Sequence, residues 1–121
     1  MKKHILIVDD EASILELLGA YLTNAGYRVT AVSTAYKAEE VAAKDKPDLV
    51  ISDLQLENSD GLELIARLKS GLPDTPMILL TGVLFDAKFV HENLAKKVSC
   101  YIEKTSPLSR ILGEVQRLLA S

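Results

Sequence analysis

Acidic side chains follow two apolar segments of this sequence at the points where those segments end. Asp53 comes shortly after residues 49–51 (LVI), and the acidic run Asp9-Asp10-Glu11 directly follows residues 5–8 (ILIV). If both segments are strands of one parallel sheet, their carboxyl ends lie at the same edge and the carboxylates meet there. Two carboxylates in close contact repel each other by about 4 kcal/mol at an effective dielectric constant near 20. The cluster therefore requires a cation.

The residue types in this cluster suit magnesium and phosphoryl chemistry. Mg²⁺ prefers oxygen ligands, typically one or two carboxylates together with waters and phosphate oxygens, and neither acidic segment contains a histidine or cysteine. An aspartate carboxylate can attack phosphorus and form an aspartyl phosphate. Such a transfer needs mainly alignment and charge neutralisation. Thr81 and Lys104, which each follow a further apolar segment, can supply a hydroxyl donor and a cation.

Short apolar segments alternate along the chain with longer amphipathic ones, which predicts parallel strands joined by helices. The predicted strands are residues 4–8, 27–33, 49–52, 77–80 and 98–102, and the second has the alternating pattern of a sheet edge. The predicted helices are residues 12–25, 35–44, 62–69 and 86–97, and a fifth that starts after Pro107. Gly26 is expected to stop the first helix.

Five such units predict a three-layer, doubly wound α/β domain, and we expect the strand order 2-1-3-4-5. This order places the first and third strands side by side at the switch point, where open α/β sheets bind ligands. Asp9, Asp10 and Asp53 would then meet at that point.

Composition and charge bound the class of protein. A chain of 121 residues with 48% apolar and 26% charged residues suits one globular domain, covering residues 1–121. The net charge of −3, without a basic stripe, argues against nucleic acid as a direct partner. One cysteine excludes an internal disulfide, and the apolar segments are too short for a signal peptide or a membrane span. We therefore expect a cytoplasmic protein that is not bound to a membrane.

Taken together, these residues resemble the receiver domains of two-component response regulators over essentially the whole chain. The matching residues are the acidic pair Asp9-Asp10, Asp53, the turn Asp60-Gly61, Thr81, Tyr101 and Lys104. The resemblance implies a flavodoxin-like (βα)5 fold and a phosphoryl group transferred to Asp53 from a sensor histidine kinase or a histidine phosphotransfer protein. It also implies Mg²⁺ bound by Asp10, Asp53 and the Gln55 carbonyl, with Asp9 acting through water. Thr81 and Lys104 would bind the phosphoryl oxygens.

The same resemblance implies a conformational switch at Thr81 and Tyr101. A phosphoryl group adds about −1.5 to −2 charges, which would draw Thr81 inward and let Tyr101 turn toward the core. The face made by the fourth helix, the fifth strand and the fifth helix would then repack and bind a downstream target or a second copy. Because no output domain follows within these 121 residues, we expect a stand-alone regulator or a piece of a larger one.

The sequence departs from the family pattern at four positions. Gly82 follows Thr81 where alanine is common. Thr105 stands where proline usually follows the lysine, and a cis bond there would cost about 2.5–4 kcal/mol, so we expect a trans Lys104-Thr105 peptide. Glu57 replaces a common proline, which predicts a looser loop after Asp53. Val83 is apolar at a position that tunes phosphate lifetime in the family, and this favours slow self-hydrolysis.

Two other functions use part of the same residue set. Aspartate-nucleophile phosphatases of the haloacid dehalogenase type also combine aspartates, a hydroxyl and a lysine, but they carry a second aspartate where this chain has Gln55. A receiver-like module could instead bind proteins without accepting phosphate, and the complete set of residues argues against that. The domain is thus expected to accept phosphate as a signal rather than to act as an enzyme on other substrates.

Overall fold

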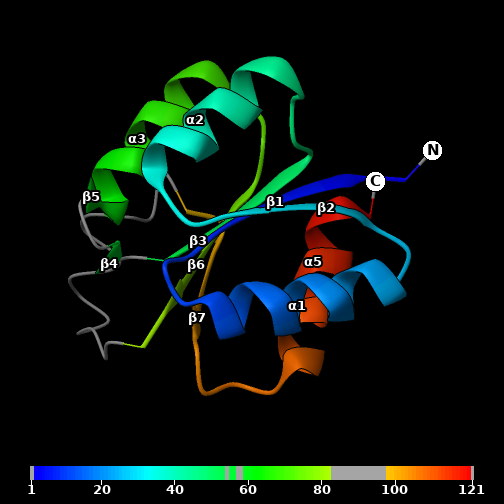
Figure 1. Ribbon diagram of the computed structural model, residues 1–121. Coiled ribbons are helices and arrows are strands. Elements are labelled where there is room, and N and C mark those ends of the chain that lie inside the picture. The colour runs from blue at the N-terminus through cyan, green and yellow to red at the C-terminus, as the bar shows by residue number, and fades with distance from the viewer. Residues whose placement is uncertain (1, 54, 57–58, 83–97, 121) are drawn as a thin grey trace.

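A five-stranded parallel sheet lies between two layers of helices (Figure 1) in the computed structural model, which describes residues 2–53, 55–56, 59–82 and 98–120. The sheet consists of β1 (His4–Val8), β2 (Arg28–Val32), β3 (Leu49–Asp53), β6 (Met77–Thr81) and β7 (Cys100–Glu103). The helices are α1 (Ala12–Asn24), α2 (Ala35–Lys44), α3 (Gly61–Gly71) and α5 (Leu108–Leu119). The sheet order β2-β1-β3-β6-β7 corresponds to 2-1-3-4-5 when its own strands are counted, and it confirms the predicted doubly wound fold.

The predicted elements that fall on described residues agree with the structure within a few residues. The segment after β3, for which no strand was predicted, contains a short antiparallel pair, β4 (Gln55–Leu56) and β5 (Ser59–Asp60). Glu57, where a looser loop was expected, lies outside the described residues. Helix α3 follows at Gly61, one residue earlier than predicted. The fourth helix predicted at 86–97 lies outside the described residues. Gly26 ends α1 as expected and has a φ of 104°, a left-handed conformation that glycine adopts readily.

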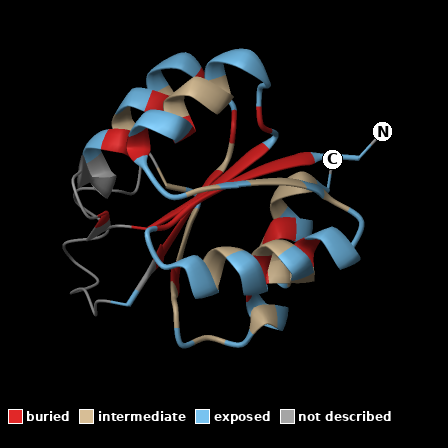
Figure 2. Ribbon diagram, viewed as in Figure 1, coloured by how far each residue is buried: buried red, intermediate tan, exposed pale blue. Residues whose placement is uncertain are grey.

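The alternation of side chains along β1 divides the core between the two faces of the sheet. Ile5 and Ile7 point to the face covered by α1 and α5, whereas Leu6 and Val8 point to the face covered by α2 and α3. All four are almost completely buried, and Figure 2 shows the buried residues along the central strands and the inner sides of the helices. The rigid central strands β1 and β3 therefore present their carboxyl ends from a fixed position.

Strand β2 is an edge strand, as its alternating pattern predicted. Its residues are exposed or only partly buried, and among the described strands it pairs only with β1. Within the described part of the chain, every helix is too short or too polar to span a membrane.

Cys100 begins β7 and is partly buried against the α1 and α5 side of the core. Burial raises the pKa of its thiol above the ordinary value of 9.0, and the neighbouring Glu114 carboxylate raises this pKa further. Because the thiolate is the reactive form, we expect iodoacetamide to modify Cys100 at pH 8 several-fold more slowly than it modifies glutathione. Glu114→Gln should speed the reaction. Intact mass against time measures both rates, and a rate equal to that of glutathione would contradict the prediction.

Candidate functional site

Asp9 and Asp53 lie next to each other because β1 and β3 are paired in parallel and end at the same level. The register places Val8 opposite Ser52, and the two aspartates follow these residues. Asp9 is 1% exposed and Asp53 is 4% exposed. The backbone N–H of Asp9 donates a hydrogen bond of 3.1 Å to the Val32 carbonyl, which fixes the start of the turn into α1. The predicted meeting of carboxylates at this sheet edge is therefore present.

Four carboxylates form one cluster at this edge. One oxygen from each of Asp9, Asp10, Glu11 and Asp53 lies within 4.8 Å of the others. Asp9 and Asp53 form the buried floor of the cluster, and Asp10 and Glu11 form its exposed side. The backbone N–H of Glu11 also donates to Asp9 Oδ1 at 2.9 Å, which holds that carboxylate in place.

Lys104 places its ammonium group among three of these carboxylates. Its Nζ lies 3.0 Å from Asp53 Oδ2, 2.7 Å from Glu11 Oε1 and 2.9–3.1 Å from the two oxygens of Asp9. Lys104 directly follows β7, which is the edge strand next to β6. This edge strand therefore supplies the positive charge to the carboxylate cluster. Its side chain is only 10% exposed, and the ammonium is the nearest counter-charge to the buried aspartates among the described residues.

The pKa values of Asp9 and Lys104 are both raised, for different reasons. Burial raises the pKa of the Asp9 carboxyl, and this effect outweighs the lowering by the Glu11 N–H and Lys104, while the charge of Asp53 adds to the increase. Burial alone would lower the pKa of Lys104, but hydrogen bonds from its ammonium to Glu11, Asp9 and Asp53 raise it well above the ordinary value. The cluster thus holds more negative charge than one lysine neutralises.

This donor set fits a divalent cation. Asp9 Oδ2 is buried and accepts no hydrogen bond from the described residues, since Lys104, although 2.9 Å away, directs its hydrogen bond to Oδ1. Oxygens bound to one octahedral Mg²⁺ are at most about 4.2 Å apart, so small side-chain rotations would suffice to bring the clustered oxygens to that spacing. The all-oxygen composition is that of a hard-cation site. Asp9, Asp10 and Asp53 are the residues that would hold it.

The remaining predicted site residues lie near this edge or beyond what the structure describes. Thr81 ends β6 and its backbone pairs with Glu103, next to Lys104. Gln55 begins β4, two residues beyond Asp53, so its backbone stays close to the predicted metal site. Val83 lies outside the described residues.

Tyr101, for which a switch role is predicted, and the altered turn after Lys104 both lie among the described residues. Tyr101 in β7 is partly buried against the core on the α2 and α3 side. The described residues contain no cis peptide bond, which confirms the trans Lys104-Thr105 peptide. Gly82, where the family often has alanine, leaves room for a methyl group, because a Cβ there would lie 3.8 Å from Lys104 Cδ. The departures from the family pattern therefore leave Lys104 in the cluster.

Glu11 is the member of the cluster for which no role was predicted from the sequence. It was visible only as the third acidic residue of a run, a position that equally suits the start of a helix. Its contact with Lys104 joins the start of α1 to the end of β7. A single sequence does not reveal the side-chain rotamers that make this contact.

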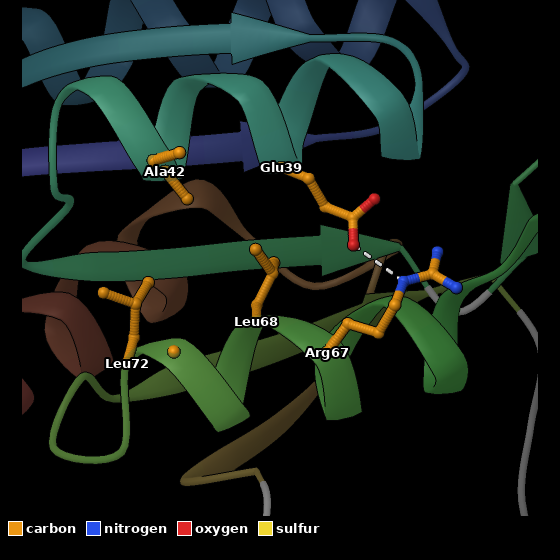
Figure 3. Close-up of a pocket in the computed structure, with 7 residues that line it drawn as sticks. Glu39, Ala42, Arg67, Leu68 and Leu72 are labelled. Carbon is orange, nitrogen blue, oxygen red and sulfur yellow. Dashed lines mark hydrogen bonds and ion pairs between the residues drawn. The ribbon is translucent and has the colours of Figure 1, made fainter.

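Two of the hollows between the described helices differ in their relation to the cluster, since one borders it and the other does not. A cavity of about 120 Å³ between α1 and the start of α5 is lined by Lys104, Leu17 and other apolar residues. Another, of about 230 Å³, lies between α2 and α3 (Figure 3). Glu39 accepts a 2.7 Å hydrogen bond from Arg67 there, and Leu68 and Leu72 line the same hollow. The residues that line this hollow include none of the cluster residues.

Comparison with known proteins identifies the family. The family model "Response regulator receiver domain" matches residues 5–116. The transcriptional regulatory protein GlrR of Escherichia coli (strain K12) is 41% identical over 79 residues, 65% of this chain and 18% of GlrR. The response regulator MprA of Mycobacterium leprae is 31% identical over 118 residues, 95% of this chain and 50% of MprA. The chain therefore spans half or less of these two relatives.

Solved structures agree with this result over nearly the full chain. The chemotaxis response regulator CheY4 of Vibrio cholerae has a TM-score of 0.89 and 26% identity, covering 98% of this chain and 100% of CheY4. The BeF3-activated receiver domain of Klebsiella pneumoniae RstA has a TM-score of 0.86 and 33% identity, with the same coverage. The chain belongs to the response regulator receiver domains, the phosphorylation-controlled signalling domains of two-component systems.

Proposed function

We propose that Asp53 accepts a phosphoryl group from a phosphohistidine donor in a Mg²⁺-dependent reaction, and that this modification changes partner binding. The observation that carries the proposal is the buried Asp53 carboxylate, held 3.0 Å from the Lys104 ammonium within a cluster of four carboxylates. A buried nucleophile, a cation and an all-oxygen metal site are the parts that phosphoryl transfer requires.

In the transfer, a carboxylate oxygen of Asp53 forms a bond to phosphorus as the bond from phosphorus to the donor breaks. The electron pair of the broken bond leaves with the donor, an imidazole nitrogen in phosphohistidine or acetate in acetyl phosphate. Mg²⁺, when bound, neutralises charge on the phosphoryl oxygens. Lys104 stabilises a further oxygen from its position beside Asp53, and Thr81 at the end of β6 supplies a hydroxyl to the same group.

A protein donor must approach the exposed side of the cluster. Asp10 and Glu11 lie on that side, and Lys104, which contacts Glu11, also lines the hollow that contains Leu17 and Leu108. Leu17 is 58% exposed, which is unusual for a large apolar side chain in this protein. We assign this surface to the histidine kinase or phosphotransfer protein.

The signal passes from Asp53 to the face that includes β7 and α5. Phosphorylation adds about −1.5 to −2 charges to an edge that already carries four carboxylates, so Lys104 and Thr81 must rearrange around the new group. Tyr101, three residues before Lys104 in β7, moves further into the core, and the face repacks to bind a target or a second copy. Phosphorylation shifts the population only as far as it favours one state over the other.

Intact mass spectrometry after incubation with Mg²⁺ and acetyl phosphate tests the acceptor. We expect one phosphate adduct that requires Mg²⁺ and is absent from Asp53→Asn. Beryllofluoride provides a second probe, because the similar RstA domain is described as BeF3-activated. We expect ¹⁹F NMR to show bound fluoride in the wild type and none in the variant.

Each alternative predicts a different result in these assays. An adduct that persists in Asp53→Asn would place the acceptor elsewhere and overturn the proposal. Protein that binds Mg²⁺ but never gains an adduct would indicate a binding module that works without phosphate. Repeated turnover of a simple phosphomonoester would instead indicate a phosphatase.

A further inference from the structure

Glu11 makes the shortest of the described contacts to Lys104. Its Oε1 lies 2.7 Å from Nζ, compared with 3.0 Å for Asp53 Oδ2 and 2.9–3.1 Å for the oxygens of Asp9. This contact joins residues 93 positions apart and bridges the start of α1 to the end of β7. The ammonium is therefore shared between the nucleophile and a residue that the proposed chemistry does not use.

The Glu11 carboxylate is not occupied in capping its own helix. Glu11 is the N-cap residue of α1, a position where serine, threonine, aspartate or asparagine normally accepts a backbone N–H. The Glu11 side chain makes no such bond, and its oxygen lies against Lys104 instead. The local sequence thus lacks a capping side chain where this cross-sheet contact is present.

Exposure distinguishes Glu11 from the other partners of Lys104. The side chain of Glu11 is 54% exposed, whereas those of Asp53 and Asp9 are 5% and 1% exposed. Water can solvate a released Glu11 carboxylate, so breaking this contact costs little. Releasing Lys104 from a buried aspartate leaves that charge without its partner. Glu11 is therefore the partner that Lys104 can leave most easily.

We propose that Glu11 is a positioning residue that anchors Lys104 reversibly and competes with an incoming phosphoryl group for the ammonium. This inference rests on the proposed function of Asp53. With Glu11 bound, Lys104 is held toward the exposed side of the cluster. When a phosphoryl oxygen arrives, Lys104 exchanges Glu11 for that oxygen. Glu11 thereby sets how readily Asp53 is phosphorylated.

Three variants separate the reach of Glu11 from its charge. Glu11→Gln removes the charge, and Glu11→Asp keeps the charge on a side chain one methylene shorter. Glu16→Gln is the matched control, since Glu16 is an exposed residue of α1 without a described hydrogen bond or ion pair. At saturating Mg²⁺ we expect acetyl phosphate to label both Glu11 variants about two- to fivefold faster than wild type, the range for loss of an exposed ion pair. Glu16→Gln should match wild type.

Two outcomes of the rate measurements would contradict the proposal that Glu11 anchors Lys104. If Glu11→Asp behaves as wild type and only Glu11→Gln is faster, charge rather than reach is responsible and the anchor is overturned. If neither Glu11 variant is faster, the competition is overturned.

Exchange of the Lys104 ammonium protons with water, followed by ¹⁵N NMR without metal or phosphodonor, tests the contact separately. The resonance is assigned by its absence in Lys104→Met. We expect exchange to be several-fold faster in both Glu11 variants and unchanged in Glu16→Gln; equal exchange in all proteins would overturn the anchor. A wild type that gains no phosphate would overturn the proposed function, and the exchange measurement would still decide whether Glu11 holds Lys104.

Discussion

Replacing Lys104 by methionine is expected to slow the phosphorylation of Asp53 by about 10²–10³-fold, the range for removing one preorganised electrostatic group. The ammonium lies 3.0 Å from the nucleophile, so the variant loses the charge that meets the phosphoryl oxygens. Mg²⁺ binding should become tighter in the same variant, by about tenfold or more, because a positive charge no longer repels the ion within a few ångströms. The time course of intact mass and a calorimetric Mg²⁺ titration measure the two effects.

The same substitution is expected to destabilise the protein when metal is absent. The raised pKa of Lys104 means that folding favours its charged form, and this contribution is fully present below the ordinary pKa of 10.5 and is lost as the pH rises through the higher folded value. At pH 7 the charged Lys104 therefore makes its full contribution to the free energy of unfolding, and the variant loses all of it. Removing one partner of a largely buried ion pair costs about 3 kcal/mol, and saturating Mg²⁺ should restore part of it.

Lys44→Met is the matched control for this experiment. Lys44 is 76% exposed and lies 3.7 Å from Glu40, so its loss should change the free energy of unfolding by less than about 0.5 kcal/mol. Urea unfolding in EDTA and in Mg²⁺ compares the two variants. If Lys104→Met bound Mg²⁺ no more tightly than wild type, Lys104 would not oppose the ion in this cluster.

The sequence predicts much of this site because strand ends are easy to locate. Apolar segments identified β1, β3 and β6 nearly to the residue, and the parallel order then required Asp9 and Asp53 to meet. Lys104 was placed correctly because it directly follows β7. These predictions depend on periodicity and connection rules, which a single sequence records.

What the sequence did not predict depends on side-chain conformation and local pairing. The pair β4 and β5 consists of two residues on each side, too short to produce an alternating pattern. The contact of Glu11 with Lys104 depends on two long side chains that reach across the sheet edge. The roles of Thr81, Tyr101 and Gln55 remain predictions.

Asp9→Asn is expected to stabilise the protein when metal is absent. The raised pKa of the Asp9 carboxyl, caused first by burial, shows that the folded environment as a whole disfavours its charge despite Lys104. The folded state therefore holds a proton more tightly than the unfolded state. The free energy of unfolding falls as the pH rises from the ordinary pKa of 3.8 through the higher folded value, and it stays low above that value.

Asparagine removes this penalty and keeps the oxygen that accepts from the Glu11 N–H. At pH 7 in EDTA we expect the free energy of unfolding of the variant to exceed that of the wild type, and the gain should shrink toward pH 4. Urea unfolding at several pH values measures it. Asp45→Asn is the control of opposite sign, because Arg28 lowers the pKa of the exposed Asp45 carboxyl and its neutralisation should destabilise the protein slightly.

In saturating Mg²⁺ we expect the wild type to be more stable than Asp9→Asn, the reverse of their order in EDTA. A bound ion would satisfy the buried Asp9 oxygen of the wild type through water, and the neutral side chain of the variant would hold that water less strongly. Asp9→Asn should therefore bind Mg²⁺ less tightly and gain less stability from it. A variant that is less stable than wild type in EDTA would show that the contact of Asp9 with Lys104 outweighs its burial. If the gain is found, the domain retains an unfavourable charge in its metal-free state because that charge is needed when the cation binds.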